Sequence, residues 1–448
     1  MKLNMRYGWL CLTALFLGFS LQAAKIEVDL EEAITLALKK NPEIREKKEL
    51  IGVSKGQLEE AKAAQWPKLE TLSFLAPMYK ITGNALGDTK DRDSWSYFFR
   101  SEGKGYVPLY TFEKISSFKM AASNKIQVDT LKTEETAHEV VYKTKEYYYS
   151  FQLAWTLTKE GDNIMQKIDK IINKAEDLVK KETGEVTRVD LYKLRVFKSA
   201  GLSKLNKAQT GQGLAQNALK MQIGFNRDAD FDIKKHRVQI EKADLQSLDD
   251  YADLALKNRP EMGQLKHGLM ARDALVKAER ASYFPMIALG FKYAAATAPL
   301  VQNQQSYFAY DIYNEGTVGA ALAFKWDLDF LTTRAKIQQL KAEHSALLAK
   351  NEYAVRGIPM QVRKAYSAVE EQAKNIEYSK EGKKYAEKWF LQSGMGTAFG
   401  IGEVKEVLES AAAIAMMTKD YYMALFDYNM ALSELTKVVG KEVTHLQY

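Results

Sequence analysis

The octapeptide at residues 36–43, Leu-Ala-Leu-Lys-Lys-Asn-Pro-Glu, returns at residues 254–261 as Leu-Ala-Leu-Lys-Asn-Arg-Pro-Glu. The same displacement aligns Trp66-Pro67 with Phe284-Pro285 and Phe112 with Phe330. Chance does not keep one register over such a distance, so the chain is predicted to be an internal duplication. We place a first repeat at residues 25–244 and a second repeat at residues 245–448.

Residues 1–24, which precede the first repeat, have the pattern of a secretory signal. Lys2 and Arg6 come first, an apolar run follows from Trp9 to Leu21, and small residues follow that run. A transmembrane anchor is the alternative, but the run is short for one. Cys11, the single cysteine, lies inside the run and not at a cleavage site, so we expect neither lipid attachment nor a disulfide.

The composition is that of a globular protein, with 46% hydrophobic and 27% charged residues. The formal net charge of +7 is small, and lysine and glutamate are mixed along the chain, so we expect no nucleic-acid partner. After residue 24, no stretch approaches the roughly 20 apolar residues of a membrane helix. If the protein spans a membrane, it must do so with strands.

Each repeat opens with helix signals. Asp29 with Glu32, and Ser247 with Asp250, have the spacing of N-terminal capping boxes. The first helix of each repeat is expected to end before the proline of the octapeptide, and a second helix follows. Pro67 and Pro285 then mark the start of strands, because there the sequence becomes aromatic and alternating.

Four strands are predicted, at about 69–79 and 95–109 in the first repeat and at about 286–293 and 318–327 in the second. The segments between them, about 80–94 and 294–316, are predicted to be solvent-facing loops. In the second repeat the apolar residues alternate consistently. The same register would turn Arg100, Glu102 and Lys104 outward in the first repeat, so a bulge, a different loop length or a raised position must intervene there.

Very long helices are predicted after the strands. No proline occurs between Pro108 and Pro260, and a helix of about 65 residues would be roughly 100 Å long. Such helices need partners along their whole length. From the helices alone, a solvated bundle with no membrane role stays open as an alternative.

Strand pairs inserted between long helices need a physical reason, since a lone hairpin is marginally stable. A closed membrane barrel supplies one, because strands cross a bilayer only when every backbone group is paired. The smallest such barrels have about eight strands, so one chain with four cannot close one. Two chains would give a barrel filled by side chains, and three would give twelve strands with room for a channel.

The chain resembles the TolC-type outer membrane efflux family over essentially its whole exported length. The resemblance rests on the duplication, the octapeptide, the strand-starting Pro67 and Pro285, and two late helix elements. Residues 184–191 follow the family's Gly-x-x-Ser/Thr-x-x-Asp-Val pattern with Gly184, Thr187 and Asp190. Their counterpart at 400–409, with Gly400 and Gly402, is a looser match.

The resemblance implies a mostly helical chain with a small β part, which as a homotrimer forms a twelve-stranded β-barrel above a long periplasmic helical barrel with a closed tip. The β-barrel would lie in outer-membrane lipid. The implied function is the exit duct of a tripartite efflux pump or type I secretion system, a passive conduit for small molecules, metal ions or proteins. The implied partners are a periplasmic adaptor (membrane fusion) protein and an inner-membrane transporter.

The resemblance also places a ring of carboxylates at the tip. Glu406 and Glu409 match it and share one helix face, so three chains would set six carboxylates around an aperture that favours cations. Asp190 and Glu403 are further aperture candidates, and solvated helix carboxylates are the alternative. The family's locking arginine corresponds to Gly402, and the equivalent position in the first repeat is Val189. Arg188 or Lys405 could replace it.

We expect no enzymatic activity, cofactor or metal site. The histidines are scattered in sequence, no cysteine accompanies them, and no Ser-His-Asp arrangement or phosphate-binding loop is recognisable. The alternative to a duct is a periplasmic coiled-coil scaffold or surface adhesin without a pore, in which the strands would form a soluble head. The cargo, the adaptor and the choice between drug efflux, metal efflux and protein secretion stay open.

Overall fold

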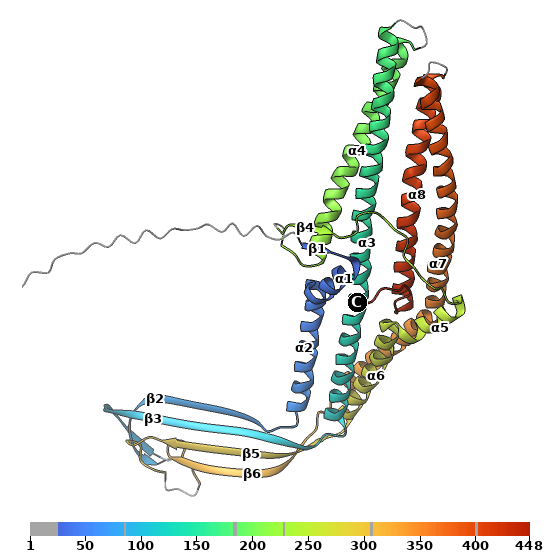
Figure 1. Cartoon of the computed structure of the whole chain (residues 1–448). Helices are drawn as coiled ribbons and strands as arrows, with labels where there is room; N and C mark the ends of the chain where they lie inside the picture. The colour runs from blue at the N-terminus through green and yellow to red at the C-terminus, as the bar shows by residue number, and fades with distance from the viewer. Residues whose placement is uncertain (1–25, 85–86, 182–185, 227–228, 305–307, 399–401) are drawn as a thin grey trace, which may run out of the picture.

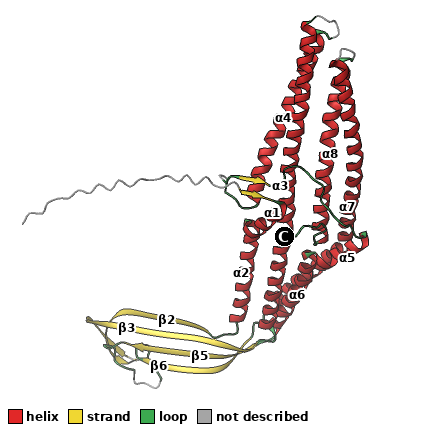
Figure 2. Ribbon diagram, viewed as in Figure 1, coloured by secondary structure: helices red, strands yellow, loops and turns green. Residues whose placement is uncertain are grey.

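The computed structural model describes residues 26–84, 87–181, 186–226, 229–304, 308–398 and 402–448 (Figure 1). The predicted secretory signal, Gly184 and Gly400 lie outside these residues. The molecule is elongated, with a small sheet at one end, paired long helices at the other, and shorter helices between them (Figures 1 and 2).

The two halves of the chain repeat one order of elements. The first half comprises β1 (Ile26–Val28), α1 (Leu30–Lys40), α2 (Pro42–Ala63), β2 (Lys68–Asn84), β3 (Gly87–Tyr110), α3 (Lys114–Lys180), α4 (Arg188–Gln222) and β4 (Phe231–Ile233). The second comprises α5 (Leu248–Asn258), α6 (Pro260–Arg280), the short 3-10 helix η1 (Ala281–Tyr283), β5 (Met286–Thr297), β6 (Glu315–Lys325), α7 (Phe330–Ala398) and α8 (Val404–Val439). The residue at which the repeats divide stays a prediction.

The octapeptide forms a helix end followed at once by a helix start. Asn41 ends α1, and its side chain accepts a hydrogen bond from the backbone N–H of Glu43 at 2.8 Å, while Pro42 is the first residue of α2. The predicted capping box of Asp29 and Glu32 is present in full. At the equivalent place Ser247 accepts from the backbone N–H of Asp250 at 3.2 Å. The bend of the first repeat thus lies at a capped helix start, whereas in the second repeat Arg259 makes no side-chain cap hydrogen bond and Pro260 begins α6.

The predicted long helices are confirmed, since α3 has 67 residues and α7 has 69. Pro359 lies inside α7, and α7 changes direction beside α5 (Figure 1). Its neighbours Ile358 and Val362 pack there with Tyr251 of α5. A proline inside a helix removes one backbone hydrogen bond and favours such a bend. Among the described helices, none is both long and apolar enough to cross a membrane.

The four long strands form one antiparallel sheet in the order β2-β3-β5-β6. The predicted strands are present but longer, and the expected loop at 80–94 was wrong. β2 continues to Asn84 and β3 begins at Gly87. The register shifts after Tyr79, which pairs with Trp95, because Lys80 pairs with Asp91 and the residues between are extra. The sequence gives no sign of this extension, because its residues are mostly polar and do not alternate. Backbone pairing beyond the alternating region needs no apolar face.

The predicted loop at 294–316 was also partly wrong. β5 continues to Thr297 and β6 begins at Glu315, and several of the described residues between them pack back on the sheet. Ala298 and Val301 are buried with Ile81 of β2. The ring of Tyr313 meets that of Phe98 at 5.5 Å. The loop therefore covers part of one sheet face instead of extending into solvent.

The helices form a layer whose two edges belong to different repeats. In the half away from the sheet, packing contacts give the order α4, α3, α8, α7. Next to the sheet they give the order α2, α3, α6, α7. One edge of the molecule is therefore β2, α2 and α4, and the other is β6 and α7.

A buried ion pair joins the end of the chain to the first repeat. Lys145 of α3, only 1% exposed, donates to Glu442 at 2.7 Å. Thr436, Thr444 and Tyr448 also donate hydrogen bonds to this carboxylate. Burial opposes its ionisation, but the Lys145 ammonium outweighs it and lowers the pKa of Glu442 to about 2.

Replacing Glu442 by glutamine should destabilise the protein strongly. Lys145 would stay buried without the carboxylate to which it donates, and breaking a buried pair costs about 3–5 kcal/mol. The thermal midpoint of the helical circular-dichroism signal should fall. The matched control is Glu59→Gln, which removes the exposed pair with Lys62 (2.8 Å) and should change the midpoint little. Equal effects would contradict the assignment.

The same pair predicts a pH dependence. A carboxyl with a lowered pKa stabilises the folded protein above its unfolded value, here 4.5. That contribution is lost as the pH falls from about 4.5 toward about 2. The thermal midpoint should decline over this window in the native protein, and the decline should be shallower in Glu442→Gln.

Candidate functional site: the wall of a conduit

One face of the sheet, here called the outer face, is apolar. Opposed residues of antiparallel strands share a face, and the register pairs Tyr293 with Val318, Phe291 with Ala320, Leu289 with Leu322 and Ile287 with Phe324. The shared face predicted for the second repeat is thereby confirmed. In the first repeat Leu69, Leu75 and Phe99 lie on the same face. The aliphatic side chains Leu75 and Val318 are strongly exposed, at 70% and 87%, whereas Ile287, Phe291 and Tyr293 are partly exposed.

The opposite face, here called the inner face, carries charge. Arg100 lies opposite Ala296, and Glu102 lies opposite Ala294, away from the apolar residues. The Arg100 guanidinium lies 3.2 Å from Glu315 and 3.0 Å from Glu102. Lys104 and Glu70 form a further pair at 3.5 Å on this face. A sheet with one apolar and one charged face suits a boundary between lipid and water.

A bulge explains how the charged residues of the first repeat turn inward. Pro108 pairs with Ala288, but Tyr110 pairs with the next residue of β5, Ile287, so Leu109 is extra. One extra residue reverses the facing of every residue beyond it. The predicted need for an irregularity in β3 is confirmed, and Leu109 supplies it.

Two glycines of β3 lie under aromatic rings on the outer face. A Cβ added to Gly103 would stand 2.3 Å from the ring of Tyr293, and one added to Gly105 would stand 2.4 Å from the ring of Phe291. Only glycine leaves room for these rings. The rings also cover backbone that glycine would otherwise expose, a known device for stabilising strands.

Neither edge of the sheet has a strand partner among the described residues, although Ile81, near the far end of β2, exchanges backbone hydrogen bonds with residues 300–302. β2 bonds only to β3 and β6 only to β5 among the described strands. β2 has 17 residues, so its free edge is a long row of backbone donors and acceptors. Long, exposed strand edges pair with other strands, and a four-stranded sheet with two exposed faces has little core of its own. The sheet is therefore incomplete in a single chain.

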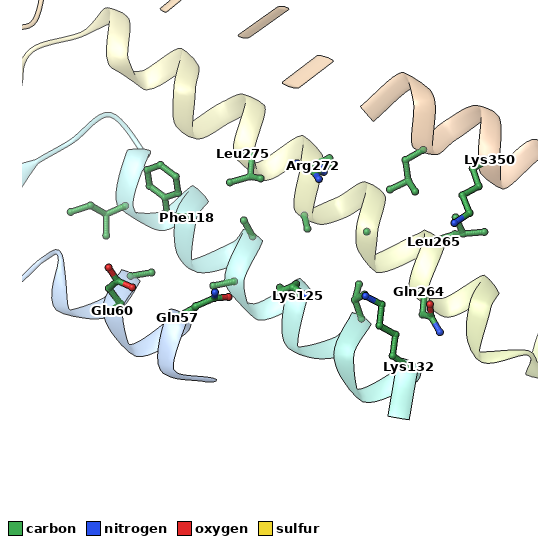
Figure 3. A pocket seen from close by; sticks show the side chains of 18 of the residues that line it. Gln57, Glu60, Phe118, Lys125, Lys132, Gln264, Leu265, Arg272, Leu275 and Lys350 are labelled. Carbon is green, nitrogen blue, oxygen red and sulfur yellow. The ribbon is translucent and has the colours of Figure 1, made fainter. Parts of the chain in front are cut away.

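A continuous hollow runs along one face of the helical layer. Its first part, with a volume of about 1070 Å³, lies between α2, α3, α6 and α7 (Figure 3). Phe118, Leu265 and Leu275 line it together with lysines such as Lys132. A second part of about 1290 Å³ shares Lys132, Glu135 and Glu261 with the first and continues toward α8.

The hollow lies along one side of α3. Lys125, Lys132 and Glu139 of α3 recur every seven residues and line it. Lys145 and Gln152, on a nearly opposite face of α3, are covered by the end of the chain and by the linker between α4 and α5. The wall therefore has a covered outside and an open inside, as a conduit requires.

At the helix tips, the sequence-predicted motif residues are helix caps. Thr187 begins α4 and forms a capping box with Asp190, whose side chain also pairs with Lys193 at 3.1 Å. The hydrogen bond from Thr187 lowers the pKa of Asp190. Asp190 is therefore committed to local bonds, whereas Glu403, Glu406 and Glu409 are exposed at the start of α8.

The face of α8 that carries Glu406 and Glu409 points away from the core. Val404, Val407 and Ala411 on the other face pack with α3, α4 and α7. Lys405 lies 4.0 Å from Glu409 and is exposed, and Val189 is 59% exposed. No described group of three or more histidine, cysteine or acidic residues could hold a metal ion. In one chain Glu406 and Glu409 are thus on the exposed surface, with Lys405 as the ion-pair neighbour of Glu409.

Several structural residues gave no signal in the sequence. Lys145 and Glu442 are 297 residues apart, and their pairing follows only from the fold. The fit between the β3 glycines and the β5 aromatic rings likewise needs the strand register. The two prolines expected to begin strands do precede β2 and β5.

Comparisons with known proteins agree with this geometry. Residues 251–441 match the family model described as outer membrane efflux protein. No curated protein matches the sequence. CusC, described in connection with transmembrane channel formation, is similar in structure with 16% identity, a TM-score of 0.74 and 93% of each chain covered.

Two further solved structures have the same fold. The open state of the MtrE outer membrane channel of Neisseria gonorrhoeae has 17% identity and a TM-score of 0.70, with 94% of this chain and 91% of that chain covered. The CmeC outer membrane channel of Campylobacter jejuni has 12% identity and a TM-score of 0.74, with 100% and 96% covered. The expected fold is therefore confirmed over almost the whole chain.

The glycine sites can be tested with a matched pair of variants. Gly103→Ala should destabilise the sheet by about 1–3 kcal/mol, because the ring of Tyr293 must move. Gly319→Ala, on β6, adds a methyl group with nothing within 4 Å and should be neutral. Thermal stability of the detergent-extracted protein measures both. Adding Tyr293→Ala to Gly103→Ala should recover part of the loss, and equal effects of the two glycine variants would rule out the packing account.

Proposed function

We propose that this chain, whose residues 251–441 match the outer membrane efflux protein family, is the outer-membrane exit duct of a tripartite efflux pump or type I secretion system. It lies in the outer membrane with a large periplasmic portion. It is a passive conduit and carries out no chemistry itself. The observation that carries the proposal is the four-stranded sheet with two free edges, an apolar outer face and a charged inner face.

Three copies complete the structure. In a bilayer no strand edge can stay unpaired, so β6 of one copy pairs with β2 of the next until the ring closes. Two copies give a barrel of about eight strands, filled by side chains, while three give about twelve and an open interior. The protein is therefore a homotrimer with a twelve-stranded barrel.

The interior of the trimer carries charged side chains along its length. The inner faces of the three sheets carry Arg100, Glu102 and Lys104, and the hollows of the three helical layers continue below them. Cargo enters from an inner-membrane transporter through a periplasmic adaptor protein, the partners with which channels of this family act. Small molecules, metal ions and proteins all fit a conduit of this kind.

The helix tips form the periplasmic aperture. The exposed Glu406 and Glu409 of three copies surround it, and the concentrated negative charge attracts cations. Gly402 and Val189 stand at the positions of the locking residues. Closure of the aperture therefore depends on contacts made by other side chains, and Arg188 and Lys405 are available for them.

A coiled-coil scaffold or adhesin without a pore is the competing function. Its strands would form a soluble head, so high-salt and carbonate washing would release it from membranes. A duct stays with the outer-membrane fraction after both washes. Release into the wash would favour the scaffold.

Single-channel recording tests the duct directly. Purified, detergent-extracted protein should give discrete, cation-selective openings in a planar bilayer. The expected preference follows from the carboxylates at the aperture. A homogeneous preparation without conductance would contradict the proposal.

The aperture is tested by charge removal. Glu406→Gln combined with Glu409→Gln should weaken block of the conductance by multivalent cations while the assembly stays intact. Glu49→Gln with Glu59→Gln, two exposed carboxylates of α2 that do not line the hollow, serves as the matched control. If block is unchanged in the double tip variant, these residues do not line the aperture.

A further inference from the structure

A groove lined by basic and aromatic side chains lies where the second repeat passes from sheet to helices. It has a volume of about 590 Å³ and is formed by the end of α6, η1 and the start of α7, at the corner where β5 and β6 join the helices (Figure 1). Arg280, Arg334 and Lys341 supply its positive charge, and Tyr283 and Phe284 supply its aromatic rings. No acidic residue is among the described residues that line it.

The chain itself does not neutralise these three cations. Lys277, nearly one turn before Arg280, pairs with Asp273 at 2.9 Å. Arg280, Arg334 and Lys341 form no ion pair among the described residues, and all three are exposed. Basic groups gathered without a counter-charge repel each other, so an anion bound between them is stabilised.

The groove is on the side of the helical layer that faces away from the hollow. On α7, Lys341 precedes Lys350 by nine residues, which at about 100° per residue turns the two side chains to opposite faces of the helix. Lys350 lines the hollow. On α6, Arg280 is about 140° round the helix from Leu275, which also lines the hollow. Because the hollow is the inside of the proposed duct, the groove is on its outside.

The chain from β6 into α7 passes from apolar to aromatic to basic residues. Leu322 and Phe324 of the outer face are followed by Trp326 and then by Arg334. The Trp326 indole Nε1 donates to the backbone carbonyl of Tyr283 at 3.2 Å, which holds this half-exposed ring at the rim of the groove. In membrane proteins aromatic rings lie at the level of the lipid headgroups, and basic side chains next to them meet lipid phosphates.

The basic groove belongs to the second repeat only. The displacement of the octapeptide places Ser116 and Ser123 where the second repeat has Arg334 and Lys341. Lys62, the first-repeat counterpart of the arginine that ends α6, is already paired with a glutamate of its own helix at 2.8 Å. The duplicated fold therefore does not by itself require basic residues at these positions.

We propose that this groove binds the headgroup of an anionic phospholipid in the periplasmic leaflet of the outer membrane. Arg280 and Arg334 hold the phosphate, since guanidinium groups bind phosphate oxygens in pairs. The flexible Lys341 side chain extends along the groove toward the same phosphate. The acyl chains lie along Trp326 and the apolar outer face of the sheet. The inference rests on the proposed outer-membrane location and adds a lipid ligand to it.

Lipid binding counted by native mass spectrometry tests the groove. The detergent-extracted assembly is titrated with phosphatidylglycerol or with phosphatidylcholine of the same acyl chains. Phosphatidylglycerol should bind the native protein more tightly. Arg280→Gln with Arg334→Gln should weaken its binding about thirtyfold, the effect expected when two basic residues next to an anionic lipid are removed. Phosphatidylcholine binding should change little.

The matched control is Lys62→Gln with Lys336→Gln. It removes the same charge near the sheet, but Lys336 is two residues after Arg334 and faces another side of α7. The control should bind phosphatidylglycerol as the native protein does. If the double variant does not assemble, Arg334→Gln alone should weaken binding about fivefold, and Arg334→Lys should recover most of that loss.

The outcomes separate the lipid site from the duct. If the native protein conducts but the double variant binds phosphatidylglycerol as tightly as the native protein or the control, the lipid site is wrong and the proposed function is untouched. Displacement of the lipid by inorganic phosphate at equal concentration would show a general anion site and would also overturn the inference. If the native protein lacks conductance and carbonate releases it from membranes, the proposed function fails, and the lipid site fails with it.

Discussion

The backbone edges of the four-stranded sheet constrain everything else in this molecule. β2 and β6 each present a row of hydrogen-bonding groups that the chain itself leaves largely unsatisfied, apart from Ile81 of β2, which bonds to residues 300–302. In lipid those groups must be paired, and in the proposed trimer other copies pair them in register. The helical layers end on corresponding edges, α2 and α4 on one side and α7 on the other. In that trimer a single rotation therefore closes the sheet and the helices together.

Because the chain is duplicated, its two repeats supply similar elements to the assembly, but the two repeats are not identical. Each repeat supplies two strands and a pair of long helices, yet the repeats differ where function requires it. Leu109 adds one residue to β3 and turns Arg100 and Glu102 to the inner face, while Val318 and Leu322 stay outside. The glycines of β3 then receive the rings of Tyr293 and Phe291. The apolar surface is thus continuous across two repeats of different register.

Much of the fold could be predicted from local signals. The caps at Asp29 and Ser247, the prolines before the strands and the proline-free helices were visible because each acts within a few residues. The far ends of β2 and β3 were missed, since Lys80 to Asn84 are mostly polar and lack alternation. The pairing of Lys145 with Glu442 was missed because it depends on tertiary structure. At the tip, the sequence identified Thr187 and Asp190 as parts of a motif, but only the structure shows that they cap the start of α4. A ring of the carboxylates at 406 and 409 depends on how several chains assemble, which the sequence of one chain does not determine.

Amide hydrogen exchange of β2 in the membrane-reconstituted assembly tests the edge pairing most directly. Alternate N–H groups of β2 do not bond to β3, and in an open sheet they face away from any partner. If β6 of another copy covers them, they should exchange as slowly as the amides of β3 at the centre of the sheet. Fast exchange at these alternate positions, with β3 protected, would mean an open edge and would contradict the closed barrel.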